Sequence, residues 1–316
     1  MNTKKFPSVL WVLALTIFAA CGGQTVAIAD QIPSSPDGTV RFVAEKVADG
    51  HPEVIWEALP PTYRNDINGL THLFATKVDA EVWDKSFGVL RKAAVVLQDQ
   101  KDLFLGSKMF AMAEDKQDEI TDNWDTGTLV FSTLVNSDIG NLKSLETIDW
   151  GQFMATTGAQ LMEVAKKASA ATEENDYENE FLAKVKGMDI EVLEKTDTTA
   201  KLKISAPDEE PEEIQMTKVE GRWVPTDMAT DWDTEVAEAR TNLEEITPET
   251  IAQQKMQIMM MVGMAEAFVD QVAQAKTSEE LDQMLQGLLG GLLGGAMGGP
   301  PPQMDDAPAE NEAPAE

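Results

Sequence analysis

The sequence predicts an α+β protein that is mostly α-helical, with a small four-stranded antiparallel sheet at about 188–225 and helices near its C-terminal end. Two patterns lead to this prediction. In the first half of the chain, apolar residues recur every three or four positions, as on one face of a helix. Between 188 and 225 they form short runs with period-two features, separated by turn-like stretches. The hydrophobic content of 43% is sufficient for a packed core.

The N-terminus has the features of an export signal. Lys4 and Lys5 precede an apolar run over 9–20, which is short for a membrane-spanning helix. Phe18-Ala19-Ala20-Cys21-Gly22 resembles a bacterial lipobox, with Phe18 where Leu is usual, and this resemblance implies a lipid on the Cys21 thiol. Ala27-Ile28-Ala29 is an alternative, ordinary cleavage site. We therefore expect a signal peptide over 1–29, and a bacterial envelope protein that is lipid-anchored or, alternatively, soluble in the periplasm or secreted.

Residues 30–36 are predicted to be a linker before a globular α+β domain over 37–245. Ser35 suits the N-cap and Pro36 the first position of a helix that ends at Gly50. Asp79 is predicted to cap a long helix that extends past Leu97. The other helices of this domain are expected at about 54–59, 62–76, 101–113, 126–136, 149–170 and 227–245.

Four strands are predicted as a meander, near 188–195, 199–206, 213–219 and 222–225. Helices are then expected over 247–289, the first opened by Thr247-Pro248-Glu249 and the second by a Thr277 and Glu280 capping box. The remaining residues, 290–316, are rich in Gly, Pro and acids. They bury too little apolar surface to offset their ordering entropy, so we expect a disordered tail.

The charge excludes one class of partner. The chain has 25 Lys and Arg against 55 Asp and Glu, a net charge of −30. Such a surface repels phosphate backbones, so we expect no nucleic-acid partner. Residues 37–113 contain 11 acids and 9 bases, whereas residues 114–316 contain 43 acids and 14 bases. We therefore expect the nearly neutral first part, next to the anchor, to face an anionic membrane.

The sequence contains no recognisable catalytic, cofactor-binding or metal-binding motif. With two His and one Cys, it offers little for a His-based metal site and no intramolecular disulfide. His51 is interpreted as a turn or cap residue and His72 as a half-exposed surface residue. The acidic residues around Asp122 and Asp227 are interpreted as solvated surface, since their spacing does not fit a calcium loop.

The most unusual pattern is a set of methionines on one helical face, Met256, Met260 and Met264. Thioethers can bind copper(I), but methionine also fills irregular contacts in a core or an interface. We favour the second interpretation, and copper titration would test the first.

Two segments resemble a known family. Ser35-Pro36-Asp37-Gly38-Thr39-Val40 begins a helix, a Gly50-His51 break and Trp56 follow, and Val219-Glu220-Gly221-Arg222-Trp223-Val224 ends the predicted sheet. Together they resemble bacterial envelope proteins of the lumazine-binding-like and nuclear-transport-factor-like group. The resemblance implies a cone-shaped α+β domain with a pocket. Catalytic members commonly hold a His/Asp pair there, which matches no position in this sequence.

These features support two main hypotheses of function. The first is an exported, non-enzymatic protein that binds a partner or a small ligand, tethered to the membrane through lipid on Cys21 if the lipobox is used. The alternative is a pocket enzyme of the cone-shaped type with an unidentified substrate. In addition, the helix over 248–275 is a candidate surface for a protein partner or for self-association.

Overall fold

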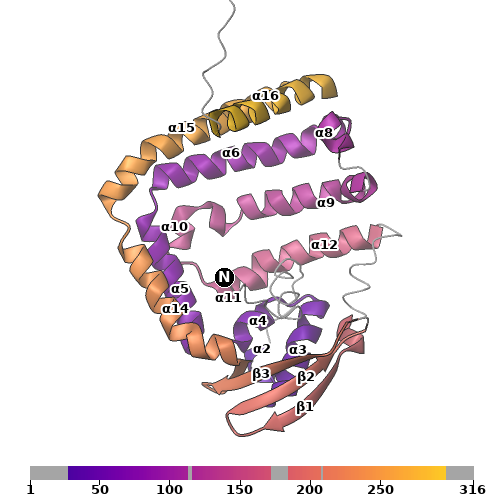
Figure 1. The fold of residues 1–316 in the computed structure, drawn as a ribbon, viewed down its shortest axis with the longest axis vertical. Coiled ribbons are helices and arrows are strands. Elements are labelled where there is room, and N and C mark those ends of the chain that lie inside the picture. The colour runs from indigo at the N-terminus through magenta and orange to yellow at the C-terminus, as the bar shows by residue number, and fades with distance from the viewer. Residues whose placement is uncertain (1–27, 113–115, 172–183, 208, 297–316) are drawn as a thin grey trace, which may run out of the picture.

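The computed structural model describes residues 28–112, 116–171, 184–207 and 209–296 (Figure 1). Its first helices are α2 (Ile28–Gln31), α3 (Pro36–Asp49), α4 (Glu53–Ala58), α5 (Pro61–Lys77), α6 (Ala80–Asp99), α7 (Lys101–Leu105) and α8 (Lys108–Ala111). The middle of the chain forms α9 (Gln117–Val135), the 3₁₀ turn η2 (Asp138–Gly140), α10 (Leu142–Leu145), α11 (Trp150–Phe153), the π-helical turn η3 (Met154–Gly158) and α12 (Ala159–Ala171).

The strands are β1 (Asp189–Lys195), β2 (Thr199–Ser205), β3 (Glu212–Val219) and β4 (Arg222–Pro225). Three C-terminal helices follow, α14 (Thr226–Glu244), α15 (Pro248–Val272) and α16 (Ser278–Ala296). The predicted class, a mostly helical α+β fold with one small antiparallel sheet, is confirmed.

The predicted helix caps are present. The side chains of Ser35, Asp79 and Thr247 accept hydrogen bonds from backbone amides in the first turns of α3, α6 and α15. Gly50 ends α3 with a φ of 102°, in the left-handed region that favours glycine. At α16, Thr277 accepts from the Glu280 amide at 3.2 Å, while the Glu280 carboxylate accepts from the Lys276 amide rather than from that of Thr277.

The sheet is a meander in the order β1-β2-β3-β4, as predicted. Its inner face buries alternate residues of β2 and β3, including Leu202 and Met216, against Ala44 of α3. On the outer face, Lys203 lies opposite Glu191 on one side and Glu213 on the other. Opposite charges on neighbouring strands stabilise this solvated face.

The sheet packs directly on the beginning of the described chain. The Trp223 indole donates to the Ser34 carbonyl at 2.8 Å, and Arg41 donates to the Met188 carbonyl at 3.0 Å. The Arg222 guanidinium donates to the carbonyl of Ala29 at 3.1 Å. The acidic second part of the chain therefore lies beside the nearly neutral first part. The expectation that the neutral part faces a membrane alone is wrong, because sheet pairing and burial of Trp223 determine this contact rather than net charge.

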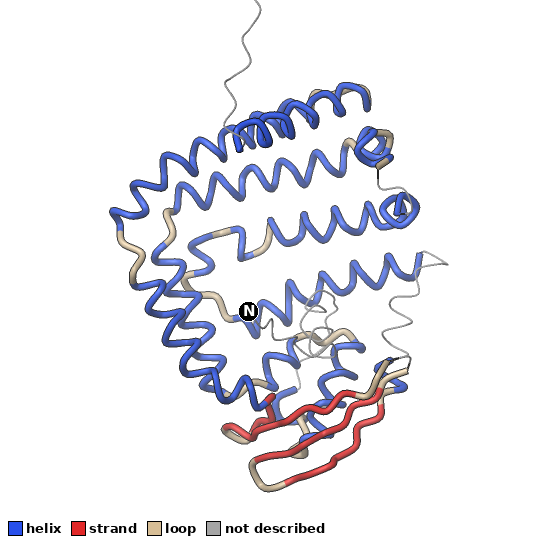
Figure 2. Tube along the Cα trace, in the orientation of Figure 1, coloured by secondary structure: helices blue, strands red, loops and turns tan. Residues whose placement is uncertain are grey.

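Four long helices, α15, α6, α9 and α12, lie side by side, and each contacts the next (Figures 1 and 2). The pair α5 and α14 packs along one side of this layer. Tyr63 of α5 stacks on Trp232 of α14 with ring centroids 3.9 Å apart, and the Trp232 indole donates to Asp66 at 3.0 Å. Burial, together with Asp233, Glu220 and Asp66, raises the pKa of Tyr63. These contacts hold α14 against α5.

The C-terminal helices pack against the helices of the first half. Leu281 of α16 is fully buried with Val96 of α6 and Val272 of α15, and the buried Asp282 accepts from the Lys108 amide at 2.8 Å. The predicted C-terminal helices over 247–289 therefore pack on helices of the predicted domain over 37–245. The α16 backbone continues as a helix to Ala296, seven residues beyond the predicted end at 289.

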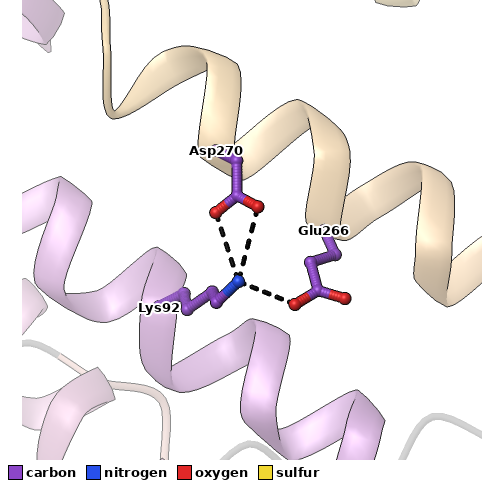
Figure 3. A network of polar contacts seen from close by, with 3 residues as sticks. All are labelled: Lys92, Glu266 and Asp270. Carbon is purple, nitrogen blue, oxygen red and sulfur yellow. Dashed lines mark hydrogen bonds and ion pairs between the residues drawn. The ribbon is translucent and has the colours of Figure 1, made fainter.

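Two ion-pair networks connect α15 to α6. The Lys92 ammonium lies 2.7 Å from Glu266 and 3.2 Å from Asp270 (Figure 3). The Lys255 ammonium lies 2.9 Å from both Asp79 and Glu81. Hydrogen bonds to these carboxylates raise the pKa values of both lysines.

Two predicted helices in the first half differ in extent. The helix expected over 101–113 is divided at Gly106 into α7 and α8, and Ser107 caps α8. The helix expected over 126–136 begins earlier, at Gln117. Its polar first half is held by Trp124, whose ring lies 5.6 Å from that of Phe104 and whose indole donates to the Leu97 carbonyl. The predicted linker over 30–36 also overlaps the end of α2.

The predicted export signal lies largely outside the described residues, as do Cys21 and residues 297–316 of the predicted tail. Within the ranges that the structure describes, no helix has both the length and the apolar character needed to cross a membrane.

Candidate functional site

An apolar groove of about 560 Å³ lies where α5, α6, η2, α10, α11 and α14 meet. It is open on one side. Its volume falls in the range of about 300–1,000 Å³ that is typical of small-molecule sites. The described residues that line it are Leu70, Thr71, Phe74, Trp83, Phe87, Ile139, Leu145, Trp150, Ala239, Asn242 and Leu243.

Helical periodicity explains why these side chains converge. Leu70 and Phe74 are four residues apart on α5, as are Trp83 and Phe87 on α6 and Ala239 and Leu243 on α14. Residues at this spacing lie on the same face of a helix, so each long helix presents at least two side chains to the groove. The adjoining core consists of buried apolar side chains, Ala75, Leu142, Leu145 and Ile148. The groove therefore rests on a packed core, which keeps its lining in place.

Aromatic rings form much of the lining. Trp83 meets Phe74 edge-on, with centroids 5.8 Å apart and an interplanar angle of 73°. The centroid of Trp83 also lies 4.9 Å from that of Phe87, with an interplanar angle of 32°. Trp150 meets Phe153 edge-on at 5.2 Å. Such pairs are worth about 0.5–1.5 kcal/mol beyond the area they bury, so they fix the ring orientations.

Some polar groups in the groove lining form hydrogen bonds within the protein and one does not. The Trp150 indole donates to the Thr71 hydroxyl at 2.9 Å, and that hydroxyl donates to the Ile67 carbonyl at 3.0 Å. The Trp83 indole nitrogen is buried and has no hydrogen-bond partner. A buried donor without a partner costs roughly 1–3 kcal/mol, so the site contains one donor whose bonding capacity is unused.

The two histidines lie outside the groove lining. His72 donates from Nε2 to the Ile148 carbonyl at 2.8 Å, and its side chain is partly buried. His51 donates from Nδ1 to Glu53 at 3.0 Å, beside the start of α4. His51 therefore occupies a turn, as predicted. Neither contact brings an imidazole together with a carboxylate inside a pocket, the arrangement that would favour the enzyme hypothesis.

No group of three or more His, Cys, Asp and Glu side chains that could hold a metal ion occurs in the described part of the chain. The carboxylate of Asp125 instead lies 2.9 Å from the Lys101 ammonium. A second hollow, of about 510 Å³, is lined by Asp233, Thr234, Ala237, Glu238, Thr241 and Asn242. All of these come from α14, so the hollow lacks the convergence of several elements that defines the apolar groove.

The methionines that the sequence singles out do not lie in a core. Met256, Met260 and Met264 project from α15 and are 79%, 61% and 59% exposed. The interpretation as core packing within the chain is therefore wrong for these three residues. The face of α15 that does pack carries Phe268, Val269 and Val272.

Sequence patterns identified the groove residues only in part. The helical spacing of Leu70 and Phe74 and of Trp83 and Phe87 indicates an apolar face on each of two predicted helices, and Trp150 and Leu243 lie on two further predicted helices. That these stripes meet without filling the space between them depends on helix packing, which periodicity does not describe. The clearest signal is that several predicted helices carry large aromatic residues, Phe74, Trp83, Phe87 and Trp150.

Comparisons of the chain with protein-family models, with curated proteins and with solved structures gave no match.

Proposed function

We propose that this chain is an exported, envelope-associated, non-enzymatic protein that binds a small neutral apolar molecule in the groove between α5, α6, α10, α11 and α14. The observation that carries the proposal is the groove itself, about 560 Å³ lined by four aromatic rings from three helices. Pockets that are mostly apolar, with a few polar groups, are the usual sites for small ligands.

The chemistry of the lining defines the class of ligand. No charged side chain is present among its described residues, so a charged ligand would be desolvated there without a counter-ion. Phe74, Trp83, Phe87 and Trp150 favour a molecule that contains rings. The Trp83 indole nitrogen is a buried donor without a partner, so a ligand with one hydrogen-bond acceptor, such as a carbonyl oxygen, would satisfy it if the indole turned toward the groove on binding.

The same lining argues against catalysis. Its described residues include no His, Cys, Ser, Lys, Asp or Glu. The Thr71 hydroxyl both donates and accepts a hydrogen bond within the protein, so it is not placed as a nucleophile. The hypothesis of a pocket enzyme therefore has no supporting contact in this groove.

The position of Ala29 supports anchoring through Cys21 over cleavage after Ala29. The Ala29 carbonyl accepts a hydrogen bond from Arg222 of β4, and α2 contacts α4. Cleavage after Ala29 would remove that carbonyl and half of α2. Processing at Cys21 would retain both, and the six residues 22–27 between Cys21 and α2 could span at most about 20–22 Å. The intact mass of the mature protein distinguishes a diacylated chain that begins at Cys21 from one that begins at Asp30.

Binding can be measured with a neutral naphthalene ketone, 6-propionyl-2-dimethylaminonaphthalene, whose fluorescence shifts to the blue in apolar surroundings. The protein is the mature chain from residue 21 with Cys21→Ser, which prevents lipidation. We expect saturable 1:1 binding with a blue-shifted emission. Trp83→Phe keeps an aromatic ring at this position but removes the indole N–H donor. We expect it to weaken binding about three- to tenfold, because a hydrogen bond contributes about 0.5–1.5 kcal/mol.

A matched pair of variants on α14 locates the site. Ala239 lines the groove, whereas Ala237 lines the second hollow. Ala239→Phe fills the groove and should abolish binding of the ketone, while Ala237→Phe should leave the affinity unchanged. Absence of saturable binding by the parent chain, or equal loss in both variants, would refute the proposed site.

A further inference from the structure

The outward face of α15 bears an apolar stripe that none of the described elements of the chain covers. Met256, Met260 and Met264 are four residues apart, so their exposed side chains lie along one side of the helix. Between residues 252 and 267, the other exposed residues of this face are small or uncharged, Ala252, Gln253, Gln257, Gly263 and Ala267. We call these eight residues the methionine face. A contiguous exposed apolar patch of this kind marks an interaction surface.

The methionine face contains no charge, although the chain has a net charge of −30, and the nearest acid in line with it is Glu249 in the first turn of α15. After its first turn, α15 has three charged residues, Lys255, Glu266 and Asp270. All three are directed to α6. Lys255 pairs with Asp79 and Glu81, while Glu266 and Asp270 pair with Lys92 (Figure 3). The ion pairs that attach α15 to α6 therefore leave its opposite side neutral.

This distribution of charge favours one binding partner for the methionine face, a second copy of the chain. Two copies with a charge of −30 each repel one another, and the repulsion is smallest where an uncharged surface meets its equivalent. A basic partner would find no carboxylate on this face. Helices that lie on membranes carry Lys and Arg on their polar face, whereas the one Lys of α15 is paired with α6.

We propose that two copies associate through their methionine faces, with the α15 helices antiparallel about a two-fold axis at Met260. The stripe is symmetric about this residue. The axis places Met256 of one copy opposite Met264 of the other, and Gln253 opposite Ala267. A two-fold interface requires such a self-complementary patch, and the flexible thioether side chains adapt to one another across it.

The dimensions of α15 set the expected affinity. Its 25 residues span roughly 37 Å, and with a width of about 10 Å the helix offers a footprint of roughly 370 Å² per copy. This is small compared with specific interfaces, which bury about 800 Å² on each partner. We therefore expect a reversible dimer with a dissociation constant in the micromolar range.

Sedimentation equilibrium of the mature Cys21→Ser chain, from about 1 to 200 μM at 0.15 M salt, tests the proposal. We expect a monomer–dimer equilibrium. Met260→Glu brings two carboxylates together at the axis and should weaken the dimer at least tenfold. Gln160→Glu adds the same charge at an exposed position of α12 and should leave the dissociation constant unchanged.

Cross-linking gives a second measurement that does not depend on destabilising the dimer. In the Cys21→Ser background, Met260→Cys should form a disulfide between copies under mild oxidation, because the residue lies on the axis. Gln160→Cys serves as the control and should react only at the rate of random collision. A parent chain that is monomeric at 200 μM, or a dimer that is unaffected by Met260→Glu, would overturn the proposal. The methionine face shares no residue with the groove, so either proposal can fail alone.

Discussion

Glu220 shows how a single residue connects distant parts of this chain. It occupies the turn between β3 and β4 with a φ of 48°, a left-handed conformation that costs a non-glycine residue about 1–2 kcal/mol. Its carboxylate accepts hydrogen bonds from the amide of Thr62, at 2.9 Å, and from the Thr62 hydroxyl, at 2.6 Å. Thr62 belongs to the first turn of α5, where the helix dipole also favours a negative charge. These interactions offset the backbone strain of the turn.

The same contacts predict a pH dependence. The hydroxyl and amide of Thr62 lower the pKa of Glu220 below its usual 4.5. A lowered pKa in the folded state contributes stability above pH 4.5, and this contribution is lost as the pH falls through the folded-state pKa. Glu220→Gln should therefore lower the melting temperature at pH 7, with a difference from the parent that shrinks toward pH 3.

Thermal melts followed by circular dichroism between pH 3 and 7 measure this effect. Glu235→Gln removes a carboxylate from an exposed position of α14 and serves as the control, with a difference from the parent that does not shrink in this way. A constant difference between the parent and Glu220→Gln over the whole range would contradict the assignment.

At the level of single elements, the sequence predicts what is determined locally. Ser35, Asp79 and Thr247 are recognisable as caps because a cap needs only its own side chain and the amides two or three residues later. The beginning of α9 is different. Its first turns are polar, and they are stabilised by Trp124 reaching Phe104 and the Leu97 carbonyl, which lie on other elements. Such tertiary contacts produce no periodic pattern of apolar residues in the sequence.

The end of α9 depends on a tertiary contact as well. Arg91 of α6 donates to the Val135 carbonyl at 3.1 Å and to the Gly140 carbonyl at 2.7 Å, so one guanidinium binds both sides of the turn that follows α9. A Cβ atom on Gly140 would lie 2.3 Å from the Val135 oxygen and 2.8 Å from Arg91 Nη2. The turn therefore requires glycine on steric grounds.

Gly140→Ala should destabilise the protein by about 1–3 kcal/mol, the usual cost of forcing extra volume into a packed site. Gly127 provides the matched control, because it lies within α9 and a Cβ atom added there would meet no atom within 4 Å apart from its chain neighbours and the backbone of its own helix. Gly127→Ala should stabilise the protein by up to about 1 kcal/mol through helix propensity. Urea denaturation gives both free energies, and a neutral Gly140→Ala would contradict the steric argument.

For the molecule as a whole, the C-terminal helices complete the fold. Leu281 is fully buried with Val96 and Val272, and the groove takes three of its lining residues from α14. The sequence predicts these helices but not where they pack, since an apolar stripe does not identify its partner. For the same reason the sequence does not predict the groove, although the helical spacing of its apolar residues indicates which sides of the helices face inward.

Leu281→Ala should lower the free energy of unfolding by about 2–5 kcal/mol, as for other fully buried leucines. Leu288→Ala, on the same helix but 40% exposed, should cost much less. Chemical denaturation of the two variants provides the comparison. Equal effects would show that α16 contributes by its presence alone and not through the packing of Leu281.

The ion pairs between Lys92 of α6 and α15 have a consequence for the order of folding. Its partners Glu266 and Asp270 lie 174 and 178 residues further along the chain. Closing a loop of this length costs about 4–5 kcal/mol of chain entropy. This cost arises before the contacts between α15 and α6 can offset it. An exported chain would enter its compartment N-terminus first, so α6 could not pack against α15 until almost the whole polypeptide had emerged.

During that interval the apolar surface of α6 around Val96 is uncovered. Docking of α15 is thus expected to be a late step, and the interval before it is when the chain is most open to aggregation and proteolysis.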